Sequence, residues 1–164
     1  MLKGKVWKLG NDVDTDQIIP SQYLLLPTIA EMKQYAFEPL NKSLAGSICV
    51  GDIIVAGENF GSGSSREQAP RVLKALGISA VVARSFARIF FRNAINIGLP
   101  VLICQDIYDE VFSGELLKID IQQGRIKNLD RQRKYSSTKL PEHIMSILEA
   151  NGLIYFLNQR EGRQ

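Results

Sequence analysis

Cysteine and histidine are scarce in this chain of 164 residues, which contains two cysteines and one histidine. Cys49 and Cys104 lie far apart in apolar runs, and neither belongs to a Cys-x-x-Cys pair, so we interpret both as buried free thiols in a reducing compartment. His143 has no second chemically active residue near it in the sequence and is interpreted as a surface residue. With so few ligand residues, the chain is poorly equipped to hold a metal ion or an iron–sulfur cluster alone, and we expect no metal site on it.

Long apolar runs and a strong net charge are also absent. No window approaches the roughly 18 apolar residues of a membrane span, and Met1–Lys5 opens into a strand-like alternation without a signal core. We therefore expect a cytoplasmic protein that has no membrane partner. The net charge of +3 is too slight to indicate a nucleic-acid partner. Five basic residues between Arg125 and Lys134 are interpreted as a solvated surface segment.

The alternation of apolar strands with helical spacing predicts an α/β fold with a partly parallel core sheet, formed by one domain over residues 1–164. Short links between these elements predict two right-handed crossovers. The expected strands of this core are Ile53–Ala56, Ile78–Ala83 and Val101–Cys104, with helices over Ala69–Leu76 and Phe86–Ile97.

Shorter elements are expected around this core. Lys3–Leu9 alternates polar and apolar residues, as a partly exposed first strand does, and Thr28 caps a short helix that runs to about Phe37. The remaining pattern predicts a loop over 38–47, a short helix over 105–113, a strand over 115–122 that continues as a hairpin through 126, a loop over 131–138, a helix over 141–150, a strand over 153–157 and a frayed polar tail over 158–164.

The stretch Gly57–Gln68, GENFGSGSSREQ, joins an apolar strand to a helix. Its three glycines allow the backbone to approach a ligand closely with N–H groups turned outward. Ser64, Ser65 and Arg66 then lie near a helix N-terminus, where an anion is favoured and a guanidinium matches a carboxylate. The alternative is that Ser64 or Ser65 is an N-cap, because an acidic or amide residue three positions later completes a capping box.

The helix expected over Phe86–Ile97 has Ser85 as its predicted cap. Arg84, Arg88 and Arg92 recur at i, i+4 and i+8 and are therefore expected on one face. This arginine stripe is either solvated or turned towards an acidic partner or substrate.

Two stretches near the N-terminus leave alternatives open. Gly10–Gln17 carries three aspartates but lacks the glycine and the closing glutamate of an EF-hand loop. It is either a polar turn or the source of a carboxylate presented to an active site. Tyr23, Leu24, Leu25 and Leu26 are either core residues or the lining of an apolar pocket or partner surface.

Three stretches together resemble the small subunits of the aconitase-type hydro-lyases: Gly10–Pro20, Gly57–Ala69 and Ser85–Pro100. They occur in the order of that family, in a chain with the length of a free-standing small subunit. The resemblance implies a swivelling three-layer β/β/α domain that closes over a separate large subunit carrying a [4Fe–4S] cluster. It further implies that this chain is inactive alone, and that a small hydroxy dicarboxylate is dehydrated and rehydrated through an alkene.

The resemblance also implies roles for individual residues. Ser64 matches the base that removes a proton from carbon, and an alkoxide there needs the N–H groups of the turn as an oxyanion hole. Ser65 and Arg66 match residues that hold a substrate carboxylate. Asp16 matches a carboxylate that supports the acid–base network, and Asp14 is the alternative aspartate.

Leu25 departs from the family members that handle an extra substrate carboxylate, because these carry an arginine after Tyr-Leu. A carboxylate buried against leucine would cost several kcal/mol, whereas an isopropyl group there gains roughly 1–2 kcal/mol. The difference favours an isopropyl-bearing substrate such as 3-isopropylmalate over citrate-like or homocitrate-like substrates, with a related hydro-lyase acting on homoaconitate kept as an alternative. Citramalate and dimethylmalate stay possible, because single methylenes are weakly discriminated. The rival hypothesis is a non-catalytic module that binds a carboxylate or RNA.

Overall fold

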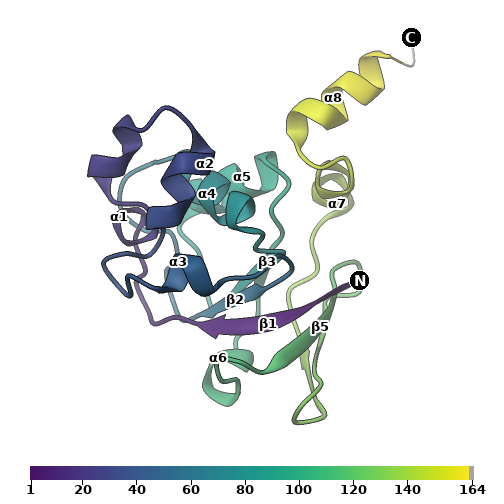
Figure 1. Ribbon diagram of the computed structural model, residues 1–164. Coiled ribbons are helices and arrows are strands. Elements are labelled where there is room, and N and C mark those ends of the chain that lie inside the picture. The colour runs from purple at the N-terminus through teal and green to yellow at the C-terminus, as the bar shows by residue number, and fades with distance from the viewer. Residues whose placement is uncertain (163–164) are drawn as a thin grey trace.

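The computed structural model describes residues 1–162, which fold around a seven-stranded sheet (Figure 1). The strand order is β4-β3-β2-β1-β5-β6-β7, in which β1 to β4 pair in parallel and β5 to β7 continue antiparallel from β1. The expected partly parallel core is therefore confirmed. The strands are β1 Leu2–Lys8, β2 Ile53–Ala56, β3 Ala80–Ala83, β4 Val101–Ile103, β5 Leu116–Asp120, β6 Arg125–Asn128 and β7 Arg133–Ser136.

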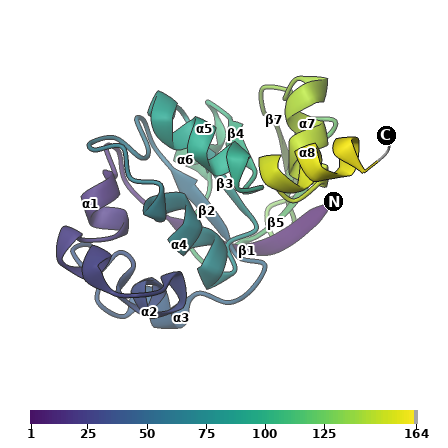
Figure 2. The ribbon, with the colours of Figure 1, turned by 90° about the horizontal axis from the view of Figure 1, so that it is seen from above.

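Helices precede or follow most of these strands. They are α1 Thr15–Ile18, α2 Ile29–Met32, α3 Leu44–Ser47, α4 Gln68–Leu76, α5 Arg88–Asn96, α6 Ile107–Glu110, α7 Glu142–Glu149 and α8 Leu153–Glu161, with 3-10 turns η1 Ser21–Leu25 and η2 Lys33–Tyr35. Figure 2 shows α4 and α5 lying over β2 and β3, with α7 and α8 beside them. Among the helices of residues 1–162, none combines the length and apolarity needed to cross a membrane.

Three layers form because both faces of the parallel strands are covered. Every residue of β2 and β3 is buried, which explains their uninterrupted apolar sequence. Ile54 and Val81 face a core shared with the helices, whereas Val55 faces a second core shared with Leu117 and Ile119 of β5. The antiparallel strands thus curl back against the parallel ones, and this packing gives the β/β/α arrangement.

Local signals set the helix ends. Gly77 adopts a left-handed φ of 95° at the C-terminus of α4, as expected for a helix stop. The side chain of Thr28 accepts a hydrogen bond from the N–H of Glu31 at 3.2 Å, so the expected cap of α2 is confirmed. The expected helix beyond Thr28 is split, because α2 ends at Met32 and a 3-10 turn follows.

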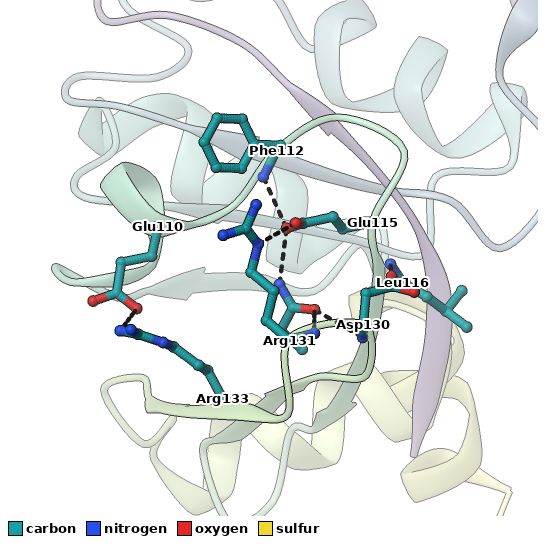
Figure 3. A network of polar contacts seen from close by, with 8 residues as sticks. Glu110, Phe112, Glu115, Leu116, Asp130, Arg131 and Arg133 are labelled. Atoms are coloured by element: carbon teal, nitrogen blue, oxygen red, sulfur yellow. Dashed lines mark hydrogen bonds and ion pairs between the residues drawn. The ribbon is translucent and has the colours of Figure 1, made fainter.

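A polar network fastens the β5–β7 hairpins together (Figure 3). Glu115 accepts hydrogen bonds from the N–H of Phe112 at 3.0 Å and from the amide of Asn128 at 2.8 Å, and it pairs with Arg131. Burial opposes ionisation of Glu115, but these hydrogen bonds outweigh it and lower the pKa of its carboxyl group. Asp130 accepts from the backbone N–H at the start of β5 at 2.6 Å.

Four segments differ from the sequence predictions. The loop expected over 131–138 is wrong, because it contains β7, whose polar composition reflects a strand with Tyr135 as its one core-facing residue. The strand expected over 153–157 is wrong, because these residues begin α8; a short apolar run does not separate strand from helix by periodicity. The expected loop over 38–47 contains α3. Of the expected polar tail, Asn158–Glu161 belongs to α8, and residues 163–164 lie outside the described residues.

The two cysteines differ in environment. Cys104 is buried, as expected, and burial raises the pKa of its thiol. Cys49 is exposed, so its prediction as a buried thiol is wrong. It lies in the turn before β2, where its backbone N–H donates to the carboxylate of Asp52 at 2.9 Å and its side chain turns to solvent. His143 is exposed on α7, as expected.

Candidate functional site

The candidate site forms where the chain leaves β1 and β2. These strands are parallel neighbours, so the segments that follow their carboxyl ends meet at one edge of the sheet. The N–H of Thr15 donates to the carbonyl of Ser62 at 2.8 Å, and the N–H of Gly61 donates to the carbonyl of Val13 at 2.7 Å. These two bonds join the aspartate-rich loop to the glycine-rich loop, as in a short parallel β-bridge. Thr15 and Ser62 are 47 residues apart in the sequence.

Glycine is required at two positions of this turn. Gly61 has a φ of 81°, and a Cβ there would lie 2.2 Å from the ring of Phe90. Gly63 has a φ of 90°, in the left-handed region that side chains disfavour. The turn therefore packs directly on α5 and presents the next two serines outward.

The serines are not helix caps. The helix α4 begins at Gln68 with Glu67 in the capping position, and no side-chain cap bond forms, so the N-cap alternative for Ser64 and Ser65 is wrong. Both serines are exposed. Within residues 1–162, the backbone N–H groups of Gly63, Ser64 and Ser65 donate to no protein acceptor. The turn thus offers exposed hydroxyl groups and free N–H donors to a ligand.

Thr15 supports this turn and was missed by the sequence reasoning. Its side chain is buried, and its Oγ1 donates to the carbonyl of Ser64 at 2.9 Å and lies 3.4 Å from the Ser64 Oγ. The signal available in the sequence was a threonine placed between two aspartates. Asp14, the alternative aspartate, caps α1 by accepting from the N–H of Gln17 at 2.8 Å.

Asp16 and Arg66 form an ion pair across the two loops. Arg66 Nη1 donates to Asp16 Oδ1 at 2.9 Å and to the carbonyl of Ile19 at 3.1 Å, and the N–H of Ser21 donates to the same carboxylate oxygen at 3.1 Å. The hydrogen bond from Arg66, followed by that from Ser21, lowers the pKa of the Asp16 carboxyl group. Asp16 is thus an ionised partner that orients Arg66, whose side chain is 19% exposed.

A pocket of about 370 Å³ opens beside the turn. Three of the predicted site residues line it, Ser64, Ser65 and Arg66, whereas Asp16 and the Tyr23–Leu26 stretch do not. The opposite wall belongs to the start of α5, where the sequence had offered only Arg88, as one of the alternatives for the arginine stripe. The remaining lining residues are Thr15, Gly61, Gly63, Ala87, Arg88, Ile89, Phe90 and Asn93.

The start of α5 differs from the sequence prediction. Ser85 does not cap this helix; its Oγ accepts from the N–H of Asn59 at 2.7 Å and so ties the glycine turn to α5. Arg84 precedes the helix, pairs with Asp109, and leaves only Arg88 and Arg92 of the expected arginine stripe on α5. Arg88 is exposed and lines the pocket.

The Tyr23–Leu26 stretch lies apart from the pocket, in and after the 3-10 turn η1. The ring of Tyr23 stacks on that of Tyr35 with centroids 3.9 Å apart, and Leu24 and Leu26 pack against the helix-side core. The side chain of Leu25 points to solvent and is 90% exposed. The core interpretation therefore fits Leu24 and Leu26, whereas Leu25 is a surface residue of the chain on its own.

Comparison with known proteins decides the family. A 3-isopropylmalate dehydratase small subunit from Hydrogenobaculum sp. (strain Y04AAS1) is 50% identical over 161 residues, which make up 98% of each chain. The chain belongs to the 3-isopropylmalate dehydratase small-subunit family. The isopropylmalate/citramalate isomerase small subunit of Methanocaldococcus jannaschii is 48% identical over 98% of this chain and 95% of its own length.

Structure and domain comparisons agree with this family. A crystal structure of 3-isopropylmalate dehydratase from Methanocaldococcus jannaschii superposes with a TM-score of 0.93 at 41% identity, covering 98% of this chain and 95% of that one. Residues 50–107, from the turn before β2 to the start of α6, match the aconitase C-terminal domain. The expected aconitase-type fold and hydro-lyase family are confirmed.

The donor set of this small subunit does not suit a metal cluster. Within residues 1–162, no group of three histidine, cysteine, aspartate or glutamate side chains lies close enough to hold a metal ion. Cys104 is buried. Cys49 is exposed, and it lies at the opposite end of the parallel strands from the serine turn. The pocket itself is lined by hydroxyl, amide and guanidinium groups, which are ligands for carboxylates.

Proposed function

We propose that the chain is the small subunit of a 3-isopropylmalate dehydratase, a cytoplasmic hydro-lyase of leucine biosynthesis. With a large subunit, it interconverts 2-isopropylmalate and 3-isopropylmalate through isopropylmaleate. The observation that carries this proposal is the Ser64-Ser65-Arg66 turn, fixed by Thr15 and Asp16 beside an open pocket, in a chain 50% identical to such a subunit.

Ser65 and Arg66 bind a substrate carboxylate. Both hydrogen bonds that hold the guanidinium use Nη1, so Nε and Nη2 are left for a ligand. An arginine fixed in this way loses little conformational entropy when it binds, and its planar fork matches a carboxylate. Asp16 and the carbonyl of Ile19 are the positioning groups for this contact.

Ser64 removes the proton from the substrate carbon during dehydration and returns it during rehydration. A serine alkoxide is far from stable at neutral pH, so it needs donors that are already in place. The free N–H groups of Gly63, Ser64 and Ser65 supply them, and Thr15 holds the turn through the Ser64 carbonyl. The substrate loses its hydroxyl group from the neighbouring carbon, which leaves the alkene.

The large subunit supplies the [4Fe–4S] cluster, because residues 1–162 of this chain do not form a ligand set for one. The pocket is open on the small subunit alone, so the large subunit also supplies the missing walls and excludes water. This division makes the isolated chain inactive.

In the closed enzyme, the apolar group of the substrate contacts the stretch formed by Tyr23, Leu24, Leu25 and Leu26. Leu25 is the specificity residue, because its 90% exposed side chain is available to be covered on closure. Burying an isopropyl group there gains roughly 1–2 kcal/mol, whereas an extra carboxylate would lose several. Citramalate is the second candidate substrate, because the Methanocaldococcus jannaschii relative is named an isopropylmalate/citramalate isomerase small subunit.

Reconstitution with a large subunit tests the proposal. We expect Ser64→Ala to abolish turnover of 2-isopropylmalate, measured by isopropylmaleate absorbance, while subunit association in sedimentation is unchanged. Ser65→Ala is the matched control and should raise KM more than it lowers kcat. Turnover by Ser64→Ala at the wild-type rate would refute the base assignment. Tight binding of 2-isopropylmalate or RNA to the isolated chain, measured by calorimetry, would favour the rival binding module.

A further inference from the structure

Four lysines form one row across the antiparallel half of the sheet. The register pairs Lys3 of β1 with Lys118 of β5, Lys118 with Lys127 of β6, and Lys127 with Lys134 of β7. Residues that pair across neighbouring strands point to the same face, about 4.8 Å apart, so the row is roughly 14 Å long. The segment 125–134, interpreted above as merely solvated, contributes two members of this row.

The row points away from the core. Leu117, Ile119 and Ile126 alternate with the lysines along β5 and β6 and are buried in the second core. Lys3, Lys118 and Lys134 are exposed, and Lys127 is half-buried. Lys5 and Arg125 share this face by alternation. We call these six basic residues, Lys3, Lys5, Lys118, Arg125, Lys127 and Lys134, the lysine face.

Among residues 1–162, the lysine face carries six basic residues and one acidic residue, so its positive charge is only partly balanced. Within residues 1–162, none of its six members forms an ion pair. Asp120, paired in register with Arg125, is the acidic residue on the outward positions of β5 to β7. Like charges directly opposite one another destabilise a sheet, so this arrangement is unfavourable for the free fold and points to an anionic ligand.

The shape and chemistry of the face narrow the ligand class. A hollow of about 460 Å³ lies on it, and this size suits a small molecule. Its charged lining residues are Lys118, Arg125, Lys127, Lys134 and one carboxylate, Asp120. Lysine ammonium groups act as point charges that suit compact phosphates, whereas planar recognition of bases uses arginine and aromatic rings. The outward positions of β5, β6 and β7 carry no aromatic residue; the nearby rings are Trp7 of β1, which contacts Lys5, and Tyr135, which lines the hollow from its core-facing position on β7.

We infer that the lysine face binds an oligophosphate, either inorganic or the triphosphate group of a nucleotide. The face is separate from the candidate active site, because Lys3 lies in the first half of β1 whereas the site follows the carboxyl ends of β1 and β2. The inference therefore stands apart from the proposed catalytic function, and each fails or succeeds without the other.

Calorimetric titration of the full chain with inorganic triphosphate tests this inference. We expect saturable binding at 50 mM NaCl that weakens at 200 mM NaCl, because salt screens exposed charges. The variant K118A/K127A should bind at least about tenfold more weakly, since two charge-assisted contacts are lost. The charge-matched control K42A/R92A, which removes two exposed cations elsewhere, should change the Kd by less than about twofold.

Parallel titrations separate the sources of the ligand. ATP should bind as tightly as inorganic triphosphate if only phosphates are recognised, and tighter binding of ATP would show that a nucleotide is the source. Thermal unfolding checks the fold of K118A/K127A, and K134Q replaces it if that variant melts early. Absence of triphosphate binding, equal loss in the control, or binding of only duplex RNA or polyglutamate would overturn the inference.

Discussion

Replacing Asp16 with asparagine tests whether this carboxylate positions Arg66. The substitution keeps the size of the side chain and removes its charge. Arg66 keeps its bond to the carbonyl of Ile19 at 3.1 Å but loses its ionic partner at 2.9 Å. The guanidinium is then free to leave the orientation in which it faces the Ser64 pocket.

The two consequences differ in size. The Asp16 side chain is 60% exposed, and exposed ion pairs contribute about 0.2–1 kcal/mol, so the melting temperature should fall by no more than about 4 °C. Misplacing a substrate-positioning group costs catalysis much more, up to about 100-fold. We therefore expect kcat/KM for 2-isopropylmalate to fall about 10- to 100-fold in the reconstituted enzyme, mainly through KM.

Glu67→Gln is the matched control. Glu67 pairs with Arg71 one helical turn later at 2.5 Å, and its side chain is 58% exposed, so the control neutralises an equally exposed carboxylate outside the pocket. It should leave kcat/KM unchanged. Equal kinetic effects of the two substitutions, or none from Asp16→Asn, would refute the positioning role of Asp16.

The pH dependence gives an independent check. The pKa of Asp16 is lowered below the ordinary value of 3.8 in the folded protein, so its contribution to stability is complete above that value. The contribution disappears as the pH falls through the folded pKa. The difference in unfolding free energy between wild type and Asp16→Asn should therefore shrink as the pH falls below 3.8 and vanish once Asp16 is protonated in the folded protein.

Three further changes have distinct expected outcomes. Thr15→Val should lower kcat and destabilise the fold by about 1–3 kcal/mol in urea unfolding, because the Ser64 carbonyl loses its donor, while Thr15→Ser should restore both. Glu115→Gln should lower the free energy of unfolding by about 1–3 kcal/mol near pH 7. Because the pKa of Glu115 is lowered in the folded protein, this difference between wild type and variant should shrink when urea unfolding is repeated at pH 4 and below. Leu25→Arg should lower isopropylmalate turnover at least about tenfold without changing the melting temperature, and unchanged turnover would contradict its pocket role.

The sequence predicted the parts of the fold that depend on local chemistry. Uninterrupted apolar runs such as Ile53–Ala56 become strands covered on both faces, and the glycine at position 77 ends a helix as expected. The segment around Tyr135 and the run after Gly152 could not be assigned in this way. The segment around Tyr135 is a strand because it pairs with β6, and this pairing is not visible in its own sequence. The run after Gly152 is a helix that packs against α7, and a short apolar run does not separate strand from helix by periodicity.

The candidate site shows the same division. The serine turn was identified from its own residues, and the motif resemblance singled out the aspartate that meets Arg66. Thr15 was not identified, because it acts through a contact 49 residues away. Arg88 was named in the arginine stripe, but its place in the pocket depends on how α5 packs against the turn, so the solvated and substrate-facing alternatives stayed open. Ser85 was misassigned because its hydroxyl group bonds to Asn59, across the turn, rather than to its own helix.

The position of β1 sets how the molecule opens. Within residues 1–162, β1 alone borders both the parallel and the antiparallel halves of the sheet, so neither core separates from the other without breaking its ladder. Amide protons in the middle of β1 should consequently exchange with deuterated solvent only through global unfolding. Because the aspartate loop continues from this strand, one half of the candidate site is attached to an element that we expect to exchange slowly.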